Sequence, residues 1–116
     1  MKQESQKTAA RRQETKRLVG VLLTSPDPRE RHRACNAIYK AMHDSLVIYF
    51  LRKLGDTGRE THKDLTAETL SKVFKKIHQY DATKGEFTTW VYSIAHNTLV
   101  DERRAFRGYD VQSRES

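Results

Sequence analysis

The sequence has little cysteine, proline or glycine and no long apolar run. One cysteine, Cys35, excludes an intramolecular disulfide bond and fits a reducing cytoplasm. Residues 1–17 contain no apolar core of the kind that a secretory signal needs, and no later apolar run approaches membrane-spanning length. These absences predict a cytoplasmic protein that has no membrane partner.

Signatures of an enzyme are missing as well. The sequence contains no glycine-rich phosphate loop and no nucleophile motif. Its histidines are scattered, and the one ligand-like spacing is the i,i+3 pair of His32 and Cys35. With 116 residues and 36% hydrophobic content, we expect one small domain without a large cleft. We therefore predict no catalytic residues, no metal and no cofactor.

Charge is what the sequence has in excess. Lysine and arginine total 22 against 15 acidic residues, which gives a formal net charge of +7. A balance of this sign favours a polyanionic partner, and nucleic acid before membrane, because no amphipathic segment has a broad apolar face with basic flanks. The alternative is that the charge serves solubility alone.

Hydrophobic periodicity predicts helices throughout and no strand. We expect an all-α fold, a compact bundle of about four helices, in which TSPDP separates the first two helices and GDTG ends the second. Thr61 or Asp64 is the expected cap of the third helix. The predicted helices span about 10–23, 27–54 and 61–79, with a fourth after the loop 80–86. The predicted divisions are a disordered basic tail at 1–10, the helical domain at 11–107 and a flexible tail at 108–116.

The fourth helix has two distinct faces. Apolar residues at three- and four-residue steps predict one buried stripe, formed by Phe87, Trp90, Val91, Ile94, Ala95 and Leu99. A polar row, with His96 beside it, follows similar steps on another face: Ser93, Asn97, Asp101 and Arg104. Side chains that donate and accept hydrogen bonds in one row are able to read base edges.

The third helix carries two acids one turn apart, Asp64 and Glu68. One interpretation is local, because Glu68 and Lys72 have the i,i+4 spacing of a helical ion pair and acids favour a helix N-terminus. The other is a small acidic patch that docks on a protein. The residues alone leave both open.

The stretch KDLTAETLSKVFKKIHQYDATKGEFTTWVYSIAHNTLVDERR resembles region 2 of bacterial sigma-70 family sigma factors, particularly the extracytoplasmic-function type. The motifs follow the family's order: an Asp-Leu-x-x-Glu helix start, an aromatic near the helix end, a glycine-containing loop, and then Phe-x-x-Trp-aliphatic-Tyr-x-Ile-Ala-x-Asn before a basic helix end. The likeness covers roughly residues 18–107. Ala67, Leu70 and His96 depart from residues frequent in the family.

The resemblance implies a sigma factor domain that binds core RNA polymerase and recognises and melts the promoter minus-ten element. It implies that the third helix docks on the clamp helices of the polymerase β′ subunit. The residues placed in or beneath that docking surface are Asp64, Leu65, Glu68 and Phe74. The family's helix-turn-helix domain for the minus-thirty-five element does not fit into GYDVQSRES. We therefore expect either a fragment or a one-domain factor.

For DNA, the resemblance implies that the loop captures a base flipped out of the non-template strand. The residues assigned to this interface are Lys72, Tyr80, Asp81, Lys84, Phe87, Ser93, Asn97, Asp101 and Arg104. Base stacking on an aromatic face together with a nearby cation returns about the few kcal/mol that extrusion costs. Asn97 and Asp101 would face bases and Arg104 a phosphate. Tyr80 has a second interpretation as a half-buried aromatic at a helix end.

Two other functions stay open. The chain is alternatively a region 2-like interaction protein that binds polymerase or an anti-sigma factor without directing initiation. A general basic nucleic-acid binder would show a steep salt dependence and no sequence preference.

Overall fold

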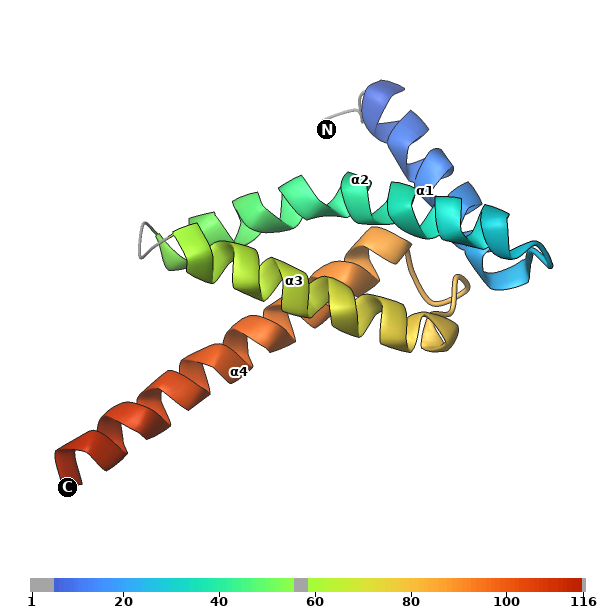
Figure 1. The fold of residues 1–116 in the computed structure, drawn as a ribbon. Helices are drawn as coiled ribbons and strands as arrows, with labels where there is room; N and C mark the ends of the chain where they lie inside the picture. Colours follow the sequence, from blue (N-terminus) through green and yellow to red (C-terminus); the bar gives the residue numbers. More distant parts are fainter. Residues whose placement is uncertain (1–5, 56–58, 116) are drawn as a thin grey trace.

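The computed structural model describes the backbone of residues 6–55 and 59–115 and the side chains of 10–55 and 61–104. Four helices and one short 3-10 turn occupy these ranges, which contain no strand, so the predicted all-α fold is confirmed. They are α1 (Gln6–Thr24), α2 (Pro28–Leu54), α3 (Arg59–Lys76), η1 (Ile77–Gln79) and α4 (Phe87–Glu115). Helices α1 and α2 form a hairpin, α3 runs antiparallel to α2, and α4 crosses α3 (Figure 1).

Helix α2 has the boundaries that its sequence predicts. Asp27 caps its start, because the carboxylate accepts a hydrogen bond from the backbone N–H of Arg29 at 3.0 Å, and Pro28 occupies the first turn. Gly55 ends the helix with φ 70°, a left-handed value that glycine adopts without a Cβ penalty. Its N–H donates to the carbonyl of Leu51 at 2.9 Å.

The other helices extend beyond their predicted ends. Helix α3 begins at Arg59, so the expected cap at Thr61 or Asp64 is wrong, and both residues lie inside the helix. The physical reason is that no proline or glycine interrupts residues 59–64. At its other end the last predicted turn is 3-10 rather than α.

Helices α1 and α4 also exceed the predicted limits. Helix α1 begins at Gln6 instead of near residue 10, and α4 continues to Glu115, beyond residue 107. Residues 1–5 and 116 of the predicted tails lie outside the described residues. Whether either tail is flexible stays a prediction.

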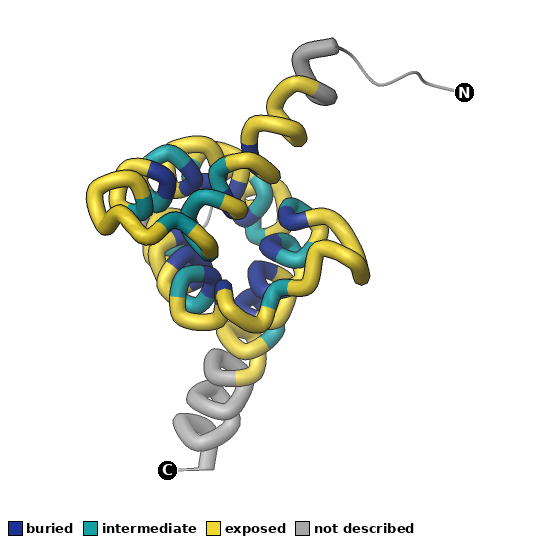
Figure 2. Tube along the Cα trace, turned by 90° about the vertical axis from the view of Figure 1, so that its right-hand side faces the viewer, coloured by how far each residue is buried: buried dark blue, intermediate teal, exposed yellow. Residues whose placement is uncertain are grey.

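The core lies where α2, α3 and α4 meet, and α1 covers one end of it through Val19. Buried positions turn toward the interior of the bundle while the outer surface is exposed (Figure 2). The predicted stripe of α4 is confirmed, with Trp90 partly buried and its other five members buried. The largest apolar side chains that are fully buried are Ile38, Leu46, Phe50, Leu70, Val73, Val91 and Leu99.

Buried threonines satisfy their hydroxyl groups within their own helices. Thr66, Thr69 and Thr98 each donate to the carbonyl four residues earlier, at 2.7–2.9 Å. No buried side-chain nitrogen or oxygen among the described residues lacks a hydrogen-bond partner. Small polar side chains therefore line the contact between helices without the cost of an unpaired group.

Truncation of a core ring tests this arrangement. We expect Phe50→Ala to lower the free energy of unfolding by about 3–5 kcal/mol, because the ring is fully buried and its removal leaves a cavity. Urea unfolding followed by circular dichroism measures the change. Tyr39→Ala is the matched control on the same helix, since its ring is 41% exposed, and it should cost less than about 1 kcal/mol. Equal losses in the two variants would contradict the assignment of the core.

Candidate functional site

Three aromatic rings join the end of α3, the loop 80–86 and the start of α4. We call Tyr80, Phe87 and Trp90 the aromatic cluster. The Tyr80 ring centroid lies 5.4 Å from that of Phe87, edge to face, and 5.4 Å from that of Trp90, tilted. Phe87 is only 4% exposed, whereas Tyr80 and Trp90 are half-buried. The cluster thus attaches the loop to the hydrophobic core.

Hydrogen bonds inside the loop fix its path. The Tyr80 hydroxyl donates to the carbonyl of Gly85 at 2.8 Å, so the ring spans the loop. A carboxylate oxygen of Asp81 accepts from the backbone N–H of Thr83 at 2.9 Å and from its hydroxyl at 2.6 Å. The N–H of Lys84 donates to the carbonyl of Asp81 at 3.0 Å, which closes a turn. The exposed side chain of Lys84 is left at the surface of this turn.

The loop also sets the acidity of two of its side chains. Burial raises the pKa of the Tyr80 hydroxyl above its usual value, and the negative charges of Glu86 and Asp81 raise it further. Hydrogen bonds from the hydroxyl and the N–H of Thr83 lower the pKa of Asp81 below its usual value. At neutral pH the loop therefore presents a neutral phenol beside an ionised carboxylate.

Helix α1 contacts the loop through an ion pair that the sequence pattern did not indicate. A guanidinium nitrogen of Arg12 lies 3.2 Å from a carboxylate oxygen of Glu86, and both side chains are about half exposed. An exposed pair of this kind contributes little stability. It does place α1 directly beside the loop, and no local spacing rule connects residues so far apart.

The outer face of α3 is acidic. Asp64 and Glu68 are exposed, while Leu65 between them is 3% exposed and belongs to the core. Phe74, further along the helix, is half-buried. The two acids therefore form the surface of this segment and the two apolar residues support it from below.

Lys72 links this acidic surface to α4. Its ammonium group donates to the hydroxyl of Thr98 at 3.1 Å and lies 3.6 Å from a carboxylate oxygen of Glu68. The predicted i,i+4 ion pair is therefore present. Thr98 is 1% exposed, so the lysine reaches toward the α3–α4 contact. The sequence pattern gave no sign of this bond between residues 26 positions apart.

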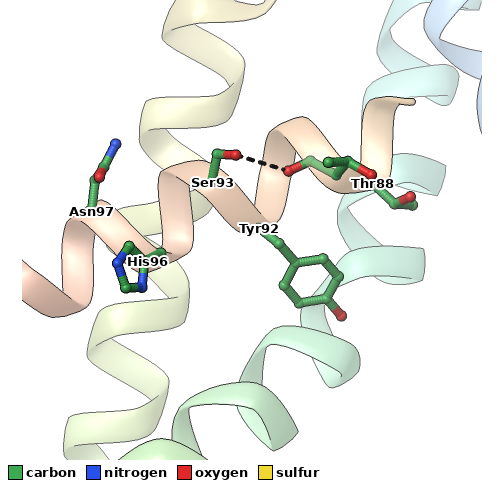
Figure 3. Close-up of a pocket in the computed structure, with 6 residues that line it drawn as sticks. Thr88, Tyr92, Ser93, His96 and Asn97 are labelled. Atoms are coloured by element: carbon green, nitrogen blue, oxygen red, sulfur yellow. Dashed lines mark hydrogen bonds between the residues drawn. The ribbon is translucent and has the colours of Figure 1, made fainter. Parts of the chain in front are cut away.

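The polar row of α4 borders a shallow hollow. Figure 3 shows Ser93 and Asn97 projecting from the same side of α4, with Tyr92 turned toward α2. The Ser93 hydroxyl donates to the carbonyl of Thr89 at 3.1 Å. His96 and Asn97 are exposed, and no described residue hydrogen-bonds to either side chain. The hollow is lined by Thr88, Thr89, Tyr92, Ser93, His96 and Asn97.

The row continues one turn further through Asp101 and Arg104. Both side chains are exposed, and neither forms a hydrogen bond or an ion pair with another described residue. Amide, carboxylate and guanidinium groups on one helix are the donors and acceptors that bind base edges and phosphates. Because the described residues leave these groups unpaired, this face is available for such contacts.

Comparison with known proteins agrees with this arrangement. The family model described as Sigma-70 region 2 matches residues 40–108, which include α3, the loop and most of α4. The chain belongs to this family. Sigma factors of this family are transcription factors rather than enzymes.

One curated relative is the ECF RNA polymerase sigma factor BldN of Streptomyces coelicolor. It is 27% identical over 74 residues, which cover 64% of this chain and 27% of that protein. The region 2 chain thus spans about a quarter of the length of that relative. No solved structure matches the chain.

The described parts of this region 2 chain hold no group of three or more side chains suited to a metal ion. Nor is any described helix long and apolar enough to cross a membrane.

Within region 2, the predicted DNA-binding residues fall into separate groups. Tyr80, Asp81 and Lys84 lie together in the loop, and the polar row lies on α4. Phe87 is buried, so its ring supports Tyr80 and does not face solvent. Lys72 is engaged with Thr98 and Glu68. The assignment of these residues to DNA stays a prediction.

The pKa of Tyr80 can be tested by nuclear magnetic resonance titration with ring-labelled tyrosine. We expect Tyr80 to titrate above the usual tyrosine pKa, with Glu86→Gln moving its pKa partly back. The folded state then holds this proton more tightly than the unfolded state. The corresponding stability is present below the unfolded pKa and is lost as pH rises through the folded pKa. A Tyr80 that titrates at or below the usual value would contradict the packing of the ring.

Proposed function

We propose that this chain acts in transcription initiation, by binding core RNA polymerase and by recognising and melting the promoter minus-ten element. The observation that carries the proposal is the family match over α3, the loop and α4. The proposed partners are core polymerase and the non-template strand of the promoter. On this proposal the chain works in the cytoplasm, where both partners are found.

Docking on polymerase is assigned to the outer face of α3. Asp64 and Glu68 are exposed acids on a basic protein, which suits a basic protein surface such as the proposed β′ clamp helices. Asp64 has no ion-pair partner among the described residues, whereas Glu68 is near Lys72. Asp64 is therefore the acid that an approaching partner engages without breaking an existing contact.

Capture of a flipped base is assigned to the loop. The part of the Tyr80 ring left exposed by the aromatic cluster offers a stacking surface, and Lys84 supplies a nearby cation. The ring is held from behind by Phe87 and Trp90 and by its hydroxyl bond to Gly85. A ring that is already fixed loses little conformational entropy when a base stacks on it.

Recognition of the upstream edge of the element is assigned to the polar row. No described residue hydrogen-bonds to the side-chain amide of Asn97, whose donors and acceptors suit the edge of adenine, and the Asp101 carboxylate suits the amino group of cytosine. Arg104, at the far end of the row, suits a phosphate.

The alternative function is a region 2-like protein that binds polymerase or an anti-sigma factor without directing initiation. Such a protein needs the face of α3 but neither the loop nor the row. Asn97, Asp101 and Arg104 have no hydrogen-bond or ion-pair partner among the described residues and share one exposed face, which favours the DNA-binding function.

A single charge reversal tests the docking surface. We expect Asp64→Lys to weaken capture of core polymerase in a pull-down by about tenfold, which corresponds to about 1.4 kcal/mol. The reason is that the substitution replaces attraction to a basic partner surface by repulsion. Asp44→Lys on α2 is the matched control, because Asp44 is 92% exposed and lies on another helix. Helix content should be unchanged in both. Unaltered capture by Asp64→Lys would remove the assignment.

Two substitutions separate base capture from base recognition. Tyr80→Ala should cost about 1–3 kcal/mol in binding of single-stranded minus-ten DNA by the polymerase complex, whatever the base, because stacking tolerates sequence. Tyr80→Phe keeps the ring and should retain most of that binding. A pre-melted bubble template should restore part of the transcription that Tyr80→Ala abolishes. Normal transcription by Tyr80→Ala from duplex promoters would leave Tyr80 as a structural aromatic.

Asn97→Ala should fail in a different way. We expect a change in base preference at one or two upstream positions, by about 1–3 kcal/mol for each base edge that the amide no longer binds, with little effect at other positions. Selection from a randomised minus-ten library measures the preference. An unchanged profile would show that the exposed face of α4 does not contact bases.

A further inference from the structure

A second hollow lies between α2 and α4, outside the residues assigned so far. Its lining is both aromatic and basic, and consists of Ser45, Ile48, Tyr49, Arg52, Lys53 and Tyr92. The Tyr49 and Tyr92 rings are 5.4 Å apart between centroids. Arg52 and Lys53, the two cations in the last turn of α2, line the hollow together with these rings. We call this surface the Tyr49–Tyr92 hollow.

Two of the residues that line this hollow are cations. Arg52 and Lys53 are exposed, and neither forms an ion pair with a described acid. The Lys53 ammonium group lies 5.8 Å from the centroid of the Tyr49 ring, a cation–π distance that holds it over the hollow. Arg103 of α4 donates to the carbonyl of Lys53 at 3.3 Å and brings a third cation to the same edge.

The Tyr49–Tyr92 hollow adjoins the hollow that borders the polar row. Tyr92 lines both the Tyr49–Tyr92 hollow and the hollow that Ser93, His96 and Asn97 border. From Tyr92 to Asn97 a helix rises roughly 7.5 Å, which is about two steps of roughly 3.4 Å along a DNA strand. A strand that meets Asn97 and runs past Tyr92 would bring a neighbouring part of its backbone near the two cations.

We propose that the Tyr49–Tyr92 hollow binds the sugar-phosphate backbone of the DNA whose bases meet the polar row. Arg52 and Lys53 contact neighbouring phosphates, and the two rings exclude water beneath them. The inference rests on the proposed function, because it takes the polar row as the base-contacting face. It adds α2 to an interface whose other predicted residues lie in the loop, on α4 and, for Lys72, on α3.

Arg52 and Lys53 also have a local role. Cations in the last turn of a helix interact favourably with the helix dipole, and this requires no ligand. That role predicts no effect of either residue on DNA affinity. A measurement of binding therefore separates the two roles.

The test is the salt dependence of promoter binding by the full chain with core polymerase, followed by fluorescence anisotropy. We expect Arg52→Gln/Lys53→Gln to reduce the slope of log affinity against log salt by about 2. The loss of DNA affinity in this double variant, relative to the unsubstituted chain, should become about tenfold smaller between roughly 50 and 200 mM salt. The deficit should be equal for all minus-ten sequences. An unchanged slope would overturn the proposal.

The control is Arg33→Gln/Lys40→Gln, which removes the same charge from the same helix. Lys40 is nine residues before Tyr49 and so lies about 180° around α2, and both control side chains are exposed. The control should leave the slope unchanged. An equal reduction in both double variants would mean long-range attraction by net charge, and would overturn the site. Circular dichroism should show both variants folded, since all four residues are exposed.

Neutral methylphosphonate linkages then locate the contact. The unsubstituted chain should lose affinity when two neighbouring phosphates are replaced, and Arg52→Gln/Lys53→Gln should be insensitive at those positions. Unaltered DNA binding with reduced capture of polymerase would instead assign the hollow to an acidic protein surface, against the proposal. No promoter-dependent binding by the unsubstituted chain would refute the proposed function itself. If Arg52→Gln/Lys53→Gln keeps both the sequence preference and the salt slope of the unsubstituted chain, only the assignment of the hollow to DNA would be refuted.

Discussion

Packing in the aromatic cluster is the constraint on which the rest of the site depends. Tyr80 follows α3 and the 3-10 turn, and its ring packs on Phe87 and Trp90 in the first turn of α4. These ring contacts hold the loop between α3 and α4 in place. The same contacts bury Phe87 and turn the apolar stripe of α4 inward. The polar row then has to face solvent, because it lies on another side of the same helix.

A second contact joins α3 to α4 further along. Lys72 crosses from α3 to the hydroxyl of Thr98 while staying close to Glu68, so the acidic face of α3 and the buried side of α4 share one cation. Lys72 therefore connects the helix of the proposed polymerase surface with the helix that carries the polar row. A partner that draws Glu68 away from Lys72 would alter the contact with α4.

The sequence predicted the faces of α4 correctly because both depend on a local period that any helix must follow. It also predicted the limits of α2, where Asp27 and Gly55 act within a few residues of their own position. Contacts that depend on the path of the whole chain could not be predicted from the sequence. They are the hydrogen bond of Lys72 to Thr98, the ion pair of Arg12 with Glu86 and the ring contact of Tyr49 with Tyr92. No spacing rule connects such partners. The basic aromatic surface on α2 was missed for that reason.

Run-off transcription by core RNA polymerase on a library of randomised minus-ten elements, with and without this chain, tests the central claim most directly. The account predicts transcripts that depend on the chain and come from a restricted set of minus-ten sequences. Transcripts that are the same in amount and sequence without the chain would contradict it. A chain that binds polymerase yet yields no such transcripts would instead leave it as an interaction protein of the region 2 family.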